Sequence, residues 1–131
     1  MPGPGSSGDL SDVDVAEWAE YGGGNVLVNT ALGATATVPT AETDSVLWGT
    51  LTAACAMTVP APVVVGEKRR LYLTQDATGS RVVTWTFTGG VCHWAGAAAP
   101  TLTTTAGHTD YIELESLDGV NWFGKYTLNL N

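Results

Sequence analysis

The chain has 131 residues, of which 44% are hydrophobic and only 14% are charged, and its formal net charge is −8. A chain of this length can bury a hydrophobic core as one domain, and its apolar content argues against disorder over most of its length. The negative charge disfavours direct binding to nucleic acid, because the phosphates would be repelled.

Residues 1–24 are predicted to form a flexible acidic N-terminal arm. Residues 1–65 carry seven acidic side chains and no lysine or arginine, whereas residues 66–131 carry six acidic and five basic ones. Such an asymmetry is typical of an interaction tail, and the alternative is a solvated tail that keeps the protein soluble. Residues 1–8 have the Pro, Gly and Ser composition of a linker, and a run of three glycines closes the arm at residue 24.

The middle of the arm has the pattern of a short amphipathic helix. Ser11 can cap it, Asp12 and Asp14 fall in its first turn, and Val15 and Trp18 share one face. A helix this short is marginal by itself, so it needs a surface on which to bury its apolar side chains. We expect the residues that contact another protein or a neighbouring subunit to be Leu10, Asp12, Asp14, Val15, Trp18 and Tyr21.

From residue 25 to residue 131 the pattern is that of short β-strands. Large apolar residues recur at every second position in segments such as 71–76, 81–87 and 121–126. The ten strands predicted are 25–30, 34–38, 46–51, 55–59, 69–75, 82–87, 91–94, 101–104, 111–116 and 121–128. The segments 76–80 and 117–120 are predicted hairpin turns, and no internal repeat with a usable period is visible. The expected fold class is all-β: a β-sandwich, a jelly roll or a barrel-like trimer subunit.

No export signal and no membrane-spanning segment are recognisable. The first five residues lack a basic region and an apolar region, and no apolar run approaches the roughly 20 residues that span a bilayer. We therefore expect synthesis in a cytoplasm, where Cys55 and Cys92 stay reduced and buried, with a bridge between them as the alternative. With His93 they supply too few ligands for a closed zinc site, so no metal or other cofactor is expected.

Patterns of catalytic residues are weak. His93 and His108 lie on separate predicted segments, so nothing in the sequence brings them together with a nucleophile. Glu113 and Glu115 alternate with apolar residues and share an outward face with Tyr111. Paired carboxylates serve glycoside hydrolysis, but a wet strand face explains them more simply. No enzymatic activity is expected.

Two further groups of residues allow more than one interpretation. Lys68-Arg69-Arg70 is the basic cluster of the chain, and it is either a solvated turn or the receiver of an acidic arm, its own or a neighbour's. The tryptophans of the strand region are expected in the core or in a subunit interface, with Trp85 and Trp122 largely buried. A row of exposed aromatic residues could instead stack on sugar rings.

Four stretches, in a preserved order, resemble a module of tailed-bacteriophage virion proteins. They are LTAACAMTVP at 51–60, LYLTQDATGSRVVTW at 71–85, APTLTTTAG at 99–107 and SLDGVNWFG at 116–124. The module recurs in tail fibres, head fibres and capsid decoration proteins, and the resemblance covers roughly residues 46–126. It implies a β-sandwich-like domain, commonly homotrimeric, with a structural or host-binding role and no enzymatic activity.

A short arm without shaft repeats fits a protein that clips onto an assembled head. We therefore expect a capsid decoration protein that is made in the host cytoplasm and binds the major capsid protein as a homotrimer on the virion surface, with no nucleic-acid or membrane partner. The alternative is a small tail-fibre or receptor-binding protein that joins other tail proteins and recognises a glycan on the host surface. A carbohydrate-active enzyme is a third, less favoured interpretation.

Overall fold

The computed structural model describes residues 24–39 and 44–131, with side chains from residue 30 onward. In these ranges the chain forms nine β-strands and one short 3-10 helix, η1 (Ala95–Ala97), so the predicted all-β class is confirmed. The strands are β1 (Gly24–Leu32), β2 (Thr35–Thr37), β3 (Asp44–Leu51), β4 (Cys55–Val59), β5 (Lys68–Gln75), β6 (Val83–Phe87), β7 (Cys92–Trp94), β8 (Thr109–Glu115) and β9 (Trp122–Leu130).

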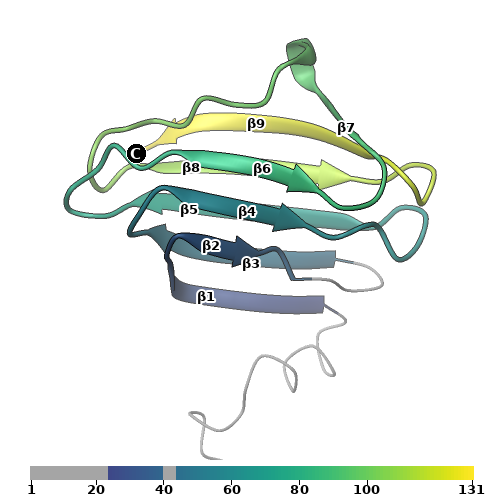
Figure 1. Cartoon of the computed structure of the whole chain (residues 1–131), viewed down its shortest axis with the longest axis horizontal. Helices are drawn as coiled ribbons and strands as arrows, with labels where there is room; N and C mark the ends of the chain where they lie inside the picture. Colours follow the sequence, from purple (N-terminus) through teal and green to yellow (C-terminus); the bar gives the residue numbers. More distant parts are fainter. Residues whose placement is uncertain (1–23, 40–43) are drawn as a thin grey trace, which may run out of the picture.

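The first six strands wind back and forth between two sheets. The larger sheet has the order β1-β3-β5-β8-β9-β7, and the smaller one has the order β2-β4-β6. Neighbours among the first six strands are parallel, because each strand of one sheet acts as the crossover between two strands of the other (Figure 1). β8 and β9 then extend the larger sheet in antiparallel fashion, and β7 pairs in parallel with β9 at its edge.

This parallel winding is a structural repeat that the sequence did not reveal. Gly24 pairs with Asp44, and Asp44 pairs with Lys68. Paired positions of β3 and β5 are therefore further apart in the sequence than those of β1 and β3. In the smaller sheet, paired positions of β4 and β6 are likewise further apart in the sequence than those of β2 and β4. Because the connections vary in length, each turn of the winding adds a strand to both sheets without any fixed period in the sequence.

The turn at 76–80 is not a hairpin, because it joins β5 to β6, which lie in different sheets. Asp76 accepts hydrogen bonds from the N–H groups of Thr78 and Gly79, and Gly79 has a φ of 73°, as the predicted turn chemistry requires. The buried amide of Gln75 then bonds to both the N–H and the C=O of Arg81. These side-chain bonds take the place of strand pairing at the end of β5, where the chain passes from the larger sheet to the smaller one.

The other predicted hairpin is confirmed, since 117–120 joins the antiparallel strands β8 and β9. The predicted strand at 101–104 is wrong, although Leu102 from this segment is buried. The N–H of Thr103 donates to the buried carboxylate of Asp110 at 2.6 Å. The Asp110 carboxylate thus bonds the backbone N–H of Thr103, which in a β-strand would bond to a neighbouring strand.

The core lies between the two sheets and follows the predicted alternation. In β8, Ile112 and Leu114 are buried, while Tyr111, Glu113 and Glu115, which alternate with them, are half-buried on the opposite face. The smaller sheet contributes Met57 to the same apolar cluster. Of the two tryptophans predicted to be buried, Trp122 is fully buried, whereas Trp85 is only half-buried because it lies on β6 at the edge of the smaller sheet.

Candidate functional site

The residues predicted to contact a partner lie outside the described residues. They are Leu10, Asp12, Asp14, Val15, Trp18 and Tyr21, and their role stays a prediction. The described part of the chain offers two other surfaces with the character of binding sites. One is an aliphatic end of the molecule, and the other is a hollow on the outer face of the larger sheet.

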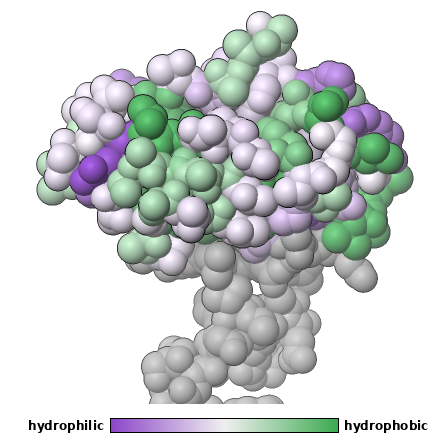
Figure 2. Space-filling view, in the orientation of Figure 1, coloured by the Kyte–Doolittle hydropathy of each residue, from purple (hydrophilic) through white to green (hydrophobic). Residues whose placement is uncertain are grey.

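Five exposed valines lie at one end of the two sheets, and we call this surface the valine end. Three connections contribute to it: the loop between β4 and β5, the loop between β6 and β7, and the turn between β8 and β9. They meet at the right-hand end of the view in Figure 1, where Figure 2 shows strongly apolar atoms at the surface. The members are Val63, Val64, Val65, Val91 and Val120, with exposed fractions from 37% to 67%.

Two hydrogen bonds and one close backbone approach join the three connections into one surface. The N–H of Gly66 donates to the carbonyl of Ser116 at 2.7 Å, and the N–H of Val91 donates to Asn121 Oδ1 at 3.0 Å. Gly90 has a φ of 87°, and a Cβ there would lie 2.2 Å from the carbonyl oxygen of Val120. Only glycine permits this approach, so the valines are brought together by a close fit of backbones.

A buried ion pair holds the first of these loops from below. Glu67 and Arg69 are both fully buried, and Arg69 donates from Nη2 and Nε to Glu67 Oε2 at 2.6 and 2.9 Å. Arg69 also donates to the carbonyls of Pro60, at 2.9 Å, and Ala61, at 3.3 Å. Glu67 Oε1 accepts from the N–H of Val63. We call these two side chains the ion-pair clamp, because together they fix both ends of the loop.

Burying the two charges of the ion-pair clamp is costly, and their hydrogen bonds offset this cost. Burial lowers the pKa of Arg69, and the hydrogen bond and charge of Glu67 oppose this effect. The guanidinium also lies 4.5 Å from the centre of the buried Trp122 ring, which adds a cation–π contact. Two buried charges stabilise a fold only when their hydrogen bonds are nearly complete, as they are here. The result is a loop of exposed valines with a fixed shape.

The rest of the basic cluster also pairs with carboxylates of the β-domain. Lys68 lies 3.4 Å from Glu113, and Arg70 lies 2.6 Å from Asp44. The solvated-turn interpretation is therefore wrong for Arg69, which is inaccessible to solvent. Its position in phase with the buried residues Leu71 and Leu73 is a sequence signal that could have indicated an inward side chain, but the sequence analysis did not use it.

The outer face of the larger sheet carries aromatic and charged rows. Tyr72 pairs with Trp48 on one side and with Tyr111 on the other, and the two tyrosine rings lie 4.8 Å apart. Trp48 is 43% exposed. Glu113 and Glu115 share this face with Tyr111, as predicted.

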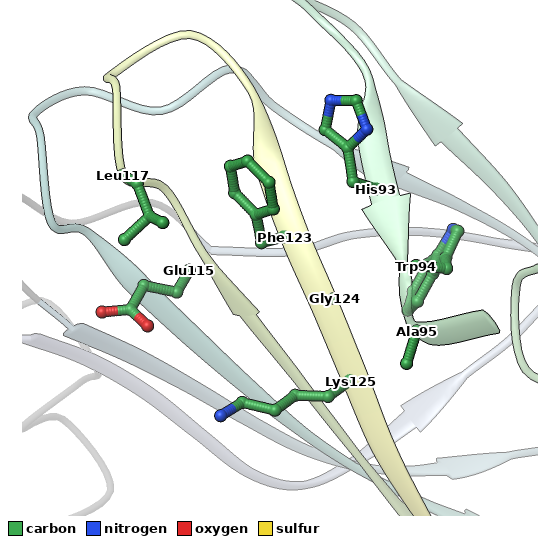
Figure 3. A pocket seen from close by; sticks show the side chains of 8 residues that line it. All are labelled: His93, Trp94, Ala95, Glu115, Leu117, Phe123, Gly124 and Lys125. Atoms are coloured by element: carbon green, nitrogen blue, oxygen red, sulfur yellow. The ribbon is translucent and has the colours of Figure 1, made fainter. Parts of the chain in front are cut away.

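A shallow hollow of about 410 Å³ lies beside the valine end on the same outer face. Its lining comes from β7, β8 and β9 and the segments next to them, and it consists of His93, Trp94, Ala95, Glu115, Leu117, Phe123, Gly124 and Lys125 (Figure 3). The rings of His93 and Phe123 stack at 5.0 Å with an angle of 25° between their planes. A Cβ on Gly124 would lie 2.6 Å from the Trp94 ring, so glycine lets Trp94 pack against β9.

The described residues offer little to a metal ion or a nucleophilic mechanism. No group of three or more His, Cys, Asp or Glu side chains gathers among them in a way that could hold a metal. Cys55 and Cys92 are both unbridged, and burial raises the pKa of the Cys92 thiol to about 12. Both histidines lie on separate segments, His93 on β7 and His108 just before β8.

Comparisons with protein families, with curated proteins and with solved structures find no match to this chain. Within the described ranges, no helix is long and apolar enough to cross a membrane. The sequence-based reasoning missed the valine end, although three consecutive valines between Pro62 and Gly66 are an unusual composition for a loop. It also missed the hollow, because its aromatic residues come from strands that are distant in the sequence.

Proposed function

We propose that this chain is a structural protein of a tailed-bacteriophage virion, specifically a capsid decoration protein that binds the assembled head as a homotrimer. Its subunit is a β-sandwich-like domain in which two sheets face each other across one core. The observation that carries the proposal is the valine end, an exposed aliphatic surface with a fixed shape. The sequence resemblance over residues 46–126 supports the choice of a virion protein.

An aliphatic surface of this kind fits a protein contact better than exposure to water. Each Å² of apolar surface removed from water contributes roughly 25 cal/mol, and contiguous exposed apolar patches commonly mark interaction sites. Among the described residues of these three connections, Asp118 is the one exposed residue with a charged side chain, so the surface next to the valines is mainly apolar. The ion-pair clamp fixes the loop before binding, which lowers the entropy cost of association.

Two groups with the chemistry for catalysis, the Glu113 carboxylate on the outer face and the Cys92 thiol beside the core, are poorly placed to react. Glu113 lies between Lys68, at 3.4 Å, and Lys125, at 3.9 Å, so its carboxylate is paired with cations. The Cys92 thiol has a pKa of about 12, so it is protonated and a poor nucleophile at neutral pH. A virion protein that acts by contact requires neither group to react.

The experiment compares two lysine substitutions at equally exposed valines. Val120 belongs to the valine end and is 56% exposed, whereas Val82 precedes β6, at the opposite end of the sheets, and is 55% exposed. We expect V120K to lose the trimer in light scattering, or to lose attachment to particles that lack the protein, while V82K behaves as the wild type. A monodisperse wild-type monomer at micromolar concentration would refute the trimer. Equal occupancy of particles by V120K and V82K would refute a role for the valine end.

A further inference from the structure

A row of four side chains from four neighbouring strands runs along the outer face, and three of them, Glu115, Phe123 and His93, line the hollow. Lys68 pairs with Glu115, Glu115 pairs with Phe123, and Phe123 pairs with His93. Neighbouring strands lie about 4.8 Å apart, so the row extends over roughly 14 Å. It places a cation, a carboxylate, an aromatic ring and an imidazole side by side on one surface.

The aromatic part of this row is held in a defined orientation. His93 covers one side of Phe123, and Figure 3 shows Leu117 and Glu115 on the other side of that ring, across the hollow. Phe123 remains 40% exposed. An exposed ring that is supported from one side offers its other face to a flat apolar surface, such as the C–H face of a pyranose.

Polar groups flank this ring face on the strands beside it. Among the described residues, the Glu115 carboxylate has no hydrogen-bond or ion-pair partner, whereas the carboxylate of Glu113 lies within ion-pair distance of two lysines. The Lys125 side chain is 69% exposed and lines the same hollow. The hollow thus has an unpaired acceptor in Glu115 and an exposed donor in Lys125, and a hydroxyl group can bond to both kinds of group.

The size and charge of the hollow restrict its ligand. A volume of about 410 Å³ lies within the range of small-molecule sites. A purely aliphatic ligand would remove Glu115 from water without giving it a hydrogen bond, which is costly. The surface around the hollow has no net charge to attract an ionic ligand, because Lys68 and Lys125 balance Glu113 and Glu115. A neutral polyol with an apolar face fits the volume, can donate a hydrogen bond to Glu115 and carries no charge.

We infer that this hollow binds a neutral hexopyranose, with the sugar ring on the open face of Phe123, a sugar hydroxyl donating to Glu115, and Lys125 donating to a sugar oxygen. The inference goes beyond attachment to the capsid, since the hollow is lined mainly by residues of the sheet and by none of the five valines of the valine end. Several copies on one particle would turn a weak single contact into firm adhesion to a glycan-coated surface.

The test uses the purified full-length protein, without particles, so its outcome is independent of capsid attachment. The probes are the methyl glycosides of galactose, glucose and mannose, each titrated into labelled protein and followed by amide NMR shifts. We expect at least one probe to shift amides of β7 and β9 around Phe123 in a saturable way. If none of the three does so, or if the shifts lie elsewhere, the inference is overturned.

Matched variants locate the contact. Phe123 and Leu130 lie on the same strand, β9, with exposed fractions of 40% and 41%. We expect F123A and E115Q to weaken binding at least about tenfold, a change equivalent to roughly 1.4 kcal/mol, while L130A binds as the wild type. F123L keeps the apolar volume and removes the ring, so it should fold normally and still lose binding. Wild-type affinity in F123L would overturn the inference.

Discussion

Removing the guanidinium of the ion-pair clamp should destabilise the fold more than any surface substitution. Arg69→Met abolishes the two hydrogen bonds to Glu67 and the bonds to two backbone carbonyls. It leaves a fully buried carboxylate without its cation, and breaking a buried pair in this way costs about 3–5 kcal/mol. That loss is large compared with the total stability of about 5–15 kcal/mol that is typical of a domain.

The assay is urea unfolding followed by tryptophan fluorescence, at one protein concentration because assembly affects apparent stability. Trp122 is a suitable reporter, since its ring lies beneath the Arg69 guanidinium. A loss of less than about 1 kcal/mol in Arg69→Met would refute the reasoning, because this is the range of exposed ion pairs.

The double variant Glu67→Leu with Arg69→Met separates stability from loop shape. Replacing a whole buried ion pair by apolar side chains is often neutral, or stabilising by about 1–4 kcal/mol, so the double variant should recover much of the lost stability. Its loop would still lack the bonds that now reach Pro60, Ala61 and Val63. We therefore expect it to fold but to assemble weakly. Assembly as tight as the wild type would show that the clamp does not preorganise the valine end.

Three further predictions concern the core, a surface ion pair and the arm. Trp122→Ala should lower the free energy of unfolding by about 3–5 kcal/mol, and Trp85→Ala by clearly less, because only the first ring is fully buried; equal losses in urea unfolding would contradict the assigned burial. The hydrogen bond from Arg81 lowers the pKa of Asp76. The ionised Asp76 carboxylate therefore contributes its full stabilisation above the ordinary aspartate pKa, and this stabilisation is lost as pH falls through the folded-state pKa of Asp76. The urea midpoint of Asp76→Asn should accordingly fall less on acidification than that of the wild type, and an equal fall would argue against this pair. Deleting residues 1–21 should leave the circular dichroism of the β-domain unchanged and abolish attachment to particles, and full occupancy by the deleted protein would show that the arm is only a solvated tail.

Some features of the candidate sites could be predicted from the sequence, and others could not. Alternation along 111–115 correctly placed Glu113 and Glu115 outside and Ile112 and Leu114 inside. It did not single out Arg69, because the charged residues next to it, Lys68 and Arg70, concealed its phase with the buried leucines. The valine end and the hollow each combine segments that are far apart in the chain, so no local pattern could have predicted them.

The sequence by itself determined where most strands lie, which of their faces is apolar, and that 117–120 forms a hairpin turn. These are local properties, because side chains alternate along every strand and an Asp-Gly turn needs only its own residues. The tertiary structure decided which strands pair, that the first six wind in parallel between two sheets, and that Glu67 and Arg69 meet in the interior. Those outcomes depend on the burial of faces from distant segments against each other, and connections of unequal length leave no period in the sequence to reveal them.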